Sequence, residues 1–123
     1  MKIKSVEEAV KVLEENAVIQ AETFENGNNK LGNRCFLKIM KSIVYLYQHD
    51  ALDSLLPLLE SDKPGARYAS AFALLPVAEE KSKAVLLELS NGNYGFLSIN
   101  SEICLLRWKN GEIIFPYQEG FHW

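Results

Sequence analysis

Short runs of helix-breaking residues interrupt this 123-residue chain and divide it into segments of helical length. Between the interruptions apolar residues recur at intervals of three and four, and no segment shows the alternation of apolar and polar residues that is typical of a strand. The main interruptions are Gly27-Asn28-Asn29, Asp62-Lys63-Pro64-Gly65, Ser90-Asn91-Gly92-Asn93 and Asn110-Gly111. This pattern predicts an all-α fold.

Six helices are expected, and several have recognisable ends. Ser5 and Glu8 form a capping box at the start of the first helix. Pro57 is expected to kink the third helix, because proline lacks an amide hydrogen. Pro76 is expected to end the fourth helix, which is rich in alanine and should be the central buried one, and to open the fifth. The predicted helices span about 5–25, 31–47, 52–59, 66–75, 76–89 and 96–109.

The helices are expected to form three antiparallel pairs, at about 5–48, 50–75 and 77–110, within a single domain of residues 1–123. Short connections and a period of about 40 residues favour stacked pairs of the HEAT or armadillo type over a four-helix bundle. The short aromatic C-terminal tail, residues 112–123, contains six large apolar side chains. We expect it to cover the open end of the last helix pair, because so many apolar side chains are unfavourable in water.

A set of motifs between about residues 30 and 115 carries a family resemblance. The motifs are Asn33-Arg34, Leu55-Leu56-Pro57-Leu58-Leu59, Gly65-Ala66-Arg67, Ala71, Ala73-Leu74-Leu75-Pro76 and Leu106-Arg107-Trp108-Lys109-Asn110-Gly111. Together they resemble a family of small bacterial HEAT-like helical-repeat domains of unknown function. The resemblance implies an all-α superhelical fold without a known cofactor or activity, and some members of the family resemble immunity proteins encoded beside polymorphic toxins. It also implies that Arg67 packs along neighbouring helices and pairs with an acid.

Composition and charge restrict the partners. The net charge of -3 and the pI near 5.4 argue against a general nucleic-acid binder, since such proteins neutralise phosphates with basic residues. The charge-free stretch from Tyr68 to Ala78 is too short to cross a bilayer, and no secretory signal is recognised, so no membrane association is expected. Cys35 and Cys104 lie in apolar helical sequence and are expected to be buried thiols in the cytoplasm.

The sequence predicts no enzyme. His49 and His122 lack the neighbours that a metal site needs, and the glycines form no phosphate loop. Asp50 and Asp53 are expected to be the N-cap and a first-turn acid of the third helix rather than a catalytic pair. We therefore expect no catalytic residue, metal or cofactor.

A basic stripe on the second predicted helix is the main candidate for a protein-binding site. Its members recur at spacings of three and four, and Asn33 adjoins them: Lys30, Asn33, Arg34, Lys38, Lys41 and Tyr45. The alternatives are an acidic face on the first helix, represented by Glu14 and Glu22, and the aromatic tail residues Tyr117, Phe121 and Trp123. A solvated polar face is the competing interpretation of both charged surfaces. Arg67 and Trp108 are expected to serve the fold.

These observations predict a cytoplasmic protein-binding module that is a monomer when free. The resemblance points to an immunity protein of a toxin system such as contact-dependent growth inhibition, which would neutralise its toxin by stoichiometric binding. The alternative is a scaffold or structural subunit of an unrelated bacterial complex.

Overall fold

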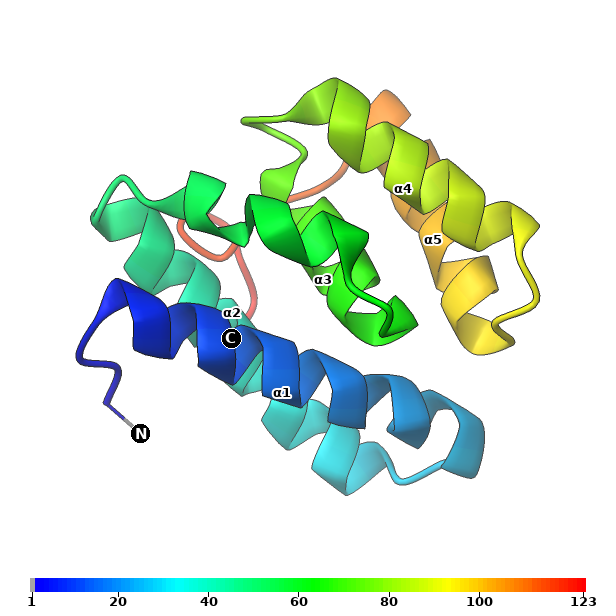
Figure 1. The fold of residues 1–123 in the computed structure, drawn as a ribbon, viewed down its shortest axis with the longest axis horizontal. Coiled ribbons are helices and arrows are strands. Elements are labelled where there is room, and N and C mark those ends of the chain that lie inside the picture. The colour runs from blue at the N-terminus through cyan, green and yellow to red at the C-terminus, as the bar shows by residue number, and fades with distance from the viewer. Residues whose placement is uncertain (1) are drawn as a thin grey trace.

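The structure is a computed structural model that describes residues 2–123. This part of the chain is helical and contains no strand, so the predicted all-α fold is confirmed (Figure 1). Each of the six predicted helices is present, five as α-helices and one as a 3₁₀ helix. They are α1 (Val6–Asn26), α2 (Asn29–Gln48), η1 (Leu52–Glu60), α3 (Pro64–Leu74), α4 (Glu79–Asn91) and α5 (Phe96–Lys109).

Local sequence signals account for several helix ends. The Ser5 hydroxyl accepts a hydrogen bond from the Glu8 amide at 3.0 Å, as the capping box predicts. Gly27 follows α1 with a φ of 74°, and Gly111 follows α5 with a φ of 70°. Both lie in the left-handed region, which glycine adopts without steric cost.

Pro57 has a larger effect than the predicted kink, because η1 is a 3₁₀ helix along its whole length. Proline offers no amide hydrogen and its ring clashes with the carbonyl four residues earlier, so the i to i−4 bonding of an α-helix is broken. Asp50 does not cap η1, contrary to expectation. It adopts a φ of 52°, and Ala51 stands at the N-cap.

The fifth predicted helix starts later than expected. Pro76 lies in a turn in which the amides of Val77 and Ala78 both donate to the Leu74 carbonyl. This turn continues the end of α3, so α4 begins only at Glu79.

The helices form two layers. In Figure 1 α1, η1 and α4 lie in front, and α2, α3 and α5 lie behind them. α1 packs against α2, η1 against α3, and α4 against α5, while α3 also contacts α1 and α4. That these pairs form a HEAT-type repeat remains a prediction.

The centre of the core is α3. Its alanines are buried, and Leu74 and the following Leu75 are inaccessible to solvent. Small residues allow the neighbouring helices to approach closely: a Cβ atom on Gly65 would lie 2.6 Å from the Ala17 carbonyl oxygen of α1. The prediction of a central buried helix is confirmed.

Arg67 links α3 to the third helix pair, as expected. Its guanidinium donates to the Ser61 carbonyl at 3.0 Å and to the Tyr94 hydroxyl at 3.2 Å, and it lies 3.5 Å from a carboxylate oxygen of Glu88. Its side chain is only 14% exposed. These contacts fit the structural role implied by the resemblance.

Trp108 joins three parts of the chain. Its indole Nε1 donates to the Glu79 carboxylate at the start of α4, at 2.8 Å, and its ring meets Phe115 of the tail edge-on. The residue is half-buried. The expected anchoring role in the last helix pair agrees with these contacts.

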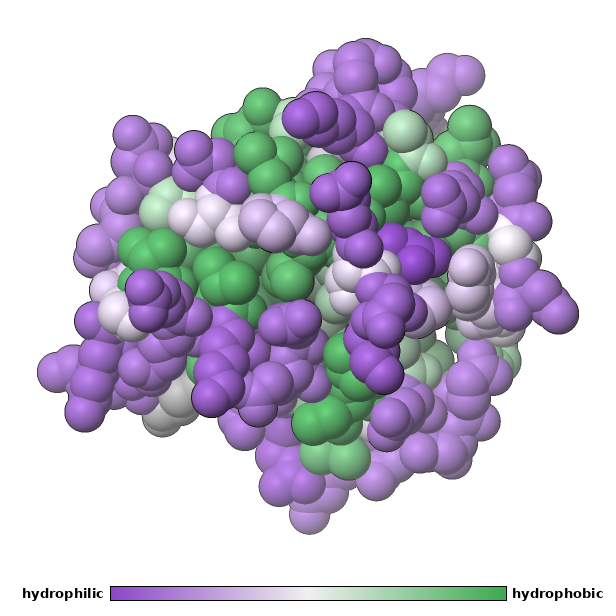
Figure 2. Space-filling view, viewed as in Figure 1, coloured by the Kyte–Doolittle hydropathy of each residue, from purple (hydrophilic) through white to green (hydrophobic). Residues whose placement is uncertain are grey.

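The face formed by α1, η1 and α4 is mainly hydrophilic. Figure 2 shows separate hydrophobic areas on this face, divided by hydrophilic side chains. Within residues 2–123, none of the helices combines the length and the apolar character that crossing a membrane requires.

Glu25 of α1 caps the start of α5. Its carboxylate accepts a hydrogen bond from the Phe96 amide at 2.9 Å, across 71 positions of sequence. Gly95 permits this approach, since a Cβ atom there would lie 2.3 Å from the same carboxylate oxygen. A carboxylate is favoured at a helix N-terminus because it compensates the free amides and the helix dipole.

Replacing Glu25 with alanine should therefore lower the free energy of unfolding by about 0.5–2 kcal/mol, the usual cost of losing an N-cap. Urea denaturation followed by circular dichroism measures this change. Glu22→Ala is the matched control, because Glu22 is an exposed glutamate one turn earlier in α1. Equal losses in the two variants would contradict the capping role.

Candidate functional site

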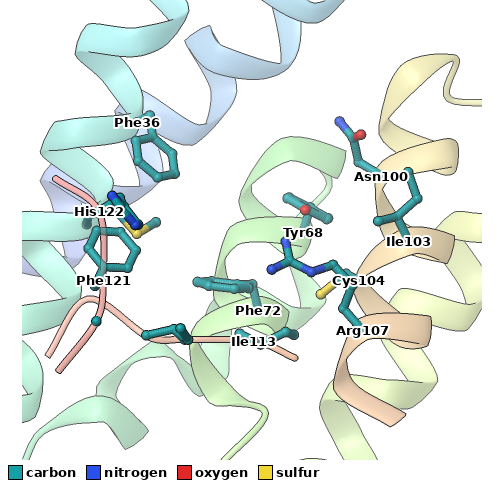
Figure 3. Close-up of a pocket in the computed structure, with 13 residues that line it drawn as sticks. Phe36, Tyr68, Phe72, Asn100, Ile103, Cys104, Arg107, Ile113, Phe121 and His122 are labelled. Atoms are coloured by element: carbon teal, nitrogen blue, oxygen red, sulfur yellow. The ribbon is translucent and has the colours of Figure 1, made fainter. Parts of the chain in front are cut away.

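A groove lies on the layer formed by α2, α3 and α5. It has a volume of about 420 Å³ and is bordered by the tail (Figure 3). The walls are mainly apolar and come from all three helices. The lining includes Phe36 and Met40 of α2, Tyr68 and Phe72 of α3, Asn100, Ile103, Cys104 and Arg107 of α5, and Ile113 and Phe121 of the tail.

A narrower slot of about 270 Å³ lies between α2 and α3 beside the groove. Phe36, Met40, Tyr68 and Phe72 line both hollows, and Phe24 of α1 is a further wall of the slot. The space between α2 and α3 is thus occupied by large aromatic side chains rather than by direct contact of the two helices.

The sequence analysis expected the tail to cover the open end of the last helix pair, but the structure shows a different path. It runs back across the second layer to α2, where the Tyr117 ring stacks on Tyr47 with 3.8 Å between centroids. Phe121 stacks on Phe36 farther along α2, with 6.3 Å between centroids. Phe115 is buried against Phe72 of α3. Phe115 also meets Trp108 of α5 edge-on, so the tail contacts aromatic rings of all three helices of this layer.

Arg107, which is an exposed residue, supplies a positive charge to the wall of this largely apolar groove. Figure 3 shows its guanidinium extending from α5 toward Tyr68 and Phe72. One of its nitrogens is 3.3 Å from the Glu112 carbonyl oxygen, a long hydrogen bond that leaves other donors of the group free to bind a ligand. Guanidinium groups bind carboxylates through two parallel hydrogen bonds, and the aromatic walls accept apolar groups. The groove is therefore suited to an acidic group with an apolar neighbour.

Burial changes the titration of two groups beside Arg107. Desolvation raises the pKa of the Cys104 thiol to about 11, against a smaller lowering by the Arg107 charge. Desolvation also raises the pKa of the Tyr68 hydroxyl well above its usual value. Cys104 raises this pKa further by a smaller amount, and the Arg107 charge lowers it slightly. Both groups are neutral at physiological pH, and the prediction of buried thiols is confirmed for both cysteines.

The predicted basic stripe is solvent-exposed, but it does not line the groove. Lys30, Asn33, Arg34, Lys38 and Lys41 are exposed, and none of the four cations contributes to the groove or the slot. The side of α2 that faces the groove carries Phe36 and Met40 instead. At 100° per residue these positions are rotated by roughly a third of a turn from the lysines.

Two members of that prediction have other surroundings. Tyr45 is half-buried and stacks on His49, with 4.0 Å between ring centroids. Asn33 lines a separate shallow hollow at the junction of α1, α2 and α5. That the six residues form a partner-binding site remains a prediction.

The alternative candidate residues differ in their exposure to solvent. On α1, Glu22 is exposed and Glu14 is half-buried. Tyr117 and Phe121 are half-buried by their stacking on α2, and Trp123 is exposed beyond them. Much of the apolar surface of the tail is thus already covered by the domain.

The sequence analysis missed an apolar row on α5. Phe96, Ile99, Ile103 and Leu106 are exposed large hydrophobic residues. Their spacing of three, four and three was visible in the sequence, but apolar residues occur on more than one side of α5, so the pattern did not show which side is buried.

The raised pKa values of Cys104 and Tyr68 predict that the protein loses stability at alkaline pH. Above pH 9 the unfolded chain releases protons that the folded chain retains, so the free energy of unfolding falls as pH rises. The loss due to Cys104 should approach about 1.4 kcal/mol per pH unit between pH 9 and 11. Urea denaturation at pH 8 to 10.5 measures it. Cys104→Ala should flatten the slope, and an unchanged slope in this variant and in Tyr68→Phe would contradict the assignment.

Comparison of the chain with protein-family models, with curated proteins and with solved structures gave no match. Among residues 2–123, no three histidine, cysteine, aspartate or glutamate side chains are grouped so that they could hold a metal ion. The groove with Arg107 is the candidate site that the geometry of the chain itself defines.

Proposed function

We propose that this chain is a protein-binding module whose groove receives an acidic segment of its partner. The observation that carries the proposal is the position of Arg107 among the aromatic walls of the groove. A carboxylate of the partner would form charge-assisted hydrogen bonds with the guanidinium, and a neighbouring apolar side chain would pack on Phe36 or Phe72. Arginine and aromatic residues are also the types that contribute most to protein interfaces.

The exposed cations of α2 support an acidic partner in a different way. No carboxylate lies within 4.0 Å of the side-chain nitrogens of Arg34, Lys38 or Lys41 in the part of the chain that the structure describes. These charges do not enter the groove, so they would act on the approach of the partner rather than on its final fit. Long-range attraction of this kind raises the rate of association and weakens with added salt.

The more specific proposal is a toxin-immunity protein. It rests on the resemblance of the sequence motifs to HEAT-like domains, among which some members resemble immunity proteins. Such a protein would bind its toxin in a stoichiometric complex and cover the active site or the substrate path. A scaffold subunit of another bacterial complex is the second candidate, and the exposed apolar row of α5 favours it, because permanent interfaces are more apolar than transient ones.

The direct experiment mixes the purified protein with the protein encoded by the adjacent gene and measures binding by titration calorimetry. The proposal predicts a one-to-one complex and, if the neighbour is toxic, loss of its activity at equimolar ratio. A toxic neighbour that neither binds nor is inhibited would contradict the immunity proposal.

Within that complex, Arg107→Ala should weaken binding by tenfold or more, because a hydrogen bond to a charged group contributes about 1.5–3 kcal/mol. Lys109→Ala is the matched control. It removes a positive charge from the same turn of α5, but Lys109 does not line the groove. Equal effects of the two variants would contradict a role of the groove.

A second pair of variants separates the charged surfaces. Lys38→Glu with Lys41→Glu should slow association and flatten its dependence on salt, with little change in dissociation. The acidic alternative predicts instead a large effect of Glu14→Lys with Glu22→Lys. Loss of binding in that second variant alone would contradict an acidic partner.

A further inference from the structure

The apolar row of α5 lies on the side of the helix that faces away from the core. Phe96, Ile99, Ile103 and Leu106, which we call the α5 stripe, are 53%, 52%, 47% and 57% exposed. The buried residues of the helix lie on the opposite side, at positions 97, 101 and 104. Four half-exposed large apolar side chains in succession are unfavourable in water, so this surface is suited to a partner.

The size of the α5 stripe fits the centre of an interface. Each half-exposed side chain leaves about 100 Å² accessible, so the stripe presents about 400 Å² of apolar surface. A standard interface buries about 800 Å² on each partner, with a polar rim around an apolar centre. On α5 the rim is available as Asn100, Glu102 and Arg107, which flank the stripe.

The spacing of the stripe indicates which kind of structural element can pack against it. Intervals of three, four and three place the four side chains on one straight seam of the helix, the pattern of the a and d positions in a coiled coil. A seam of this kind is matched by a second helix with the same spacing. The α5 helix of a second copy of this chain has this spacing.

We infer that two copies of this chain associate through their α5 stripes, with the two helices antiparallel. A two-fold axis near the middle of the stripe would place Phe96 opposite the partner's Leu106 and Ile99 opposite the partner's Ile103. Such an interface is self-complementary, as two-fold symmetric dimers require. Antiparallel helices also bring opposite ends of their dipoles together.

The charges at the two ends of α5 support the antiparallel arrangement. Glu25 sits on the first turn of α5 through its bond to the Phe96 amide, and Arg107 and Lys109 lie in the last turn. In an antiparallel pair, the acidic end of each copy faces the basic end of the other. A parallel pair would place Glu25 opposite the partner's Glu25 and the basic residues opposite one another.

This inference does not rest on the proposed function, since it concerns the protein alone. It also departs from the monomer that the sequence analysis expected. Ile103 belongs to the stripe and also lines the groove, so the dimer interface would border the groove directly.

Sedimentation velocity of the protein alone, from about 5 to 500 μM, tests the association. The sedimentation coefficient should rise from the monomer to the dimer value over this range. Ile99→Asp with Ile103→Asp should raise the dissociation constant at least tenfold, and circular dichroism checks that this variant is folded. The matched control is Leu87→Asp, which changes a side chain of α4 that is 54% exposed and outside the stripe.

Disulfide trapping tests the orientation. Phe96→Cys and Leu106→Cys proteins, mixed under mild oxidation, should form a covalent heterodimer, while each variant alone should form few covalent dimers. The native Cys35 and Cys104 are buried and do not interfere. A monomer at every concentration, equal weakening by Leu87→Asp, or disulfides formed mainly within the single variants would overturn the proposal.

Discussion

The close approach of α3 to α1 determines how the rest of the structure is arranged. At Gly65 the backbone of α3 comes so near to Ala17 that no side chain fits between the two helices. α3 meets η1 and α4 on its other sides, so it holds the first and third helix pairs in fixed positions. α2 belongs to the first pair and α5 to the third. The space left between these two helices and α3 is the groove.

The tail completes this arrangement by joining α2, α3 and α5 through aromatic rings. Phe115 lies between Phe72 and Trp108, and Tyr117 extends the contact to Tyr47. One border of the groove is therefore formed by a segment that also contributes to the core. A partner that enters the groove would meet a surface whose shape is already fixed, which lowers the entropic cost of binding.

Local signals in the sequence were enough to place the six helices, although the type of η1 and the start of α4 differ from the prediction. The path of the tail and the role of Glu25 depend instead on long-range contacts. The start of α1 after Ser5 and the end of α5 before Gly111 depend on residues a few positions away. The path of the tail depends on Tyr47, which precedes Tyr117 by 70 positions, and the role of Glu25 depends on Phe96, 71 positions later. Neither pairing leaves a pattern in a single sequence.

The candidate site shows the same limit. Spacing correctly placed the cations of α2 on one exposed side, but the rotation of that helix against α1 decides which side faces the groove, and it is the side with Phe36. Arg107 was visible in one of the motifs on which the resemblance rests, yet its position in the groove requires α3 and the tail as neighbours. The chemistry of the groove therefore emerges only from the packing of the layers.

The measurement that tests this packing most directly is the free energy of unfolding of Gly65→Ala. Alanine favours a helix over glycine by about 1 kcal/mol, so a loosely packed α3 would be stabilised. The close approach predicts the opposite sign, a loss of about 1–3 kcal/mol, because the added methyl group forces the two helices apart. Gly32→Ala, whose methyl group meets only the side chain of Thr23, is the matched control and should cost less. A Gly65→Ala protein as stable as the parent, or more stable, would contradict the central place of this contact.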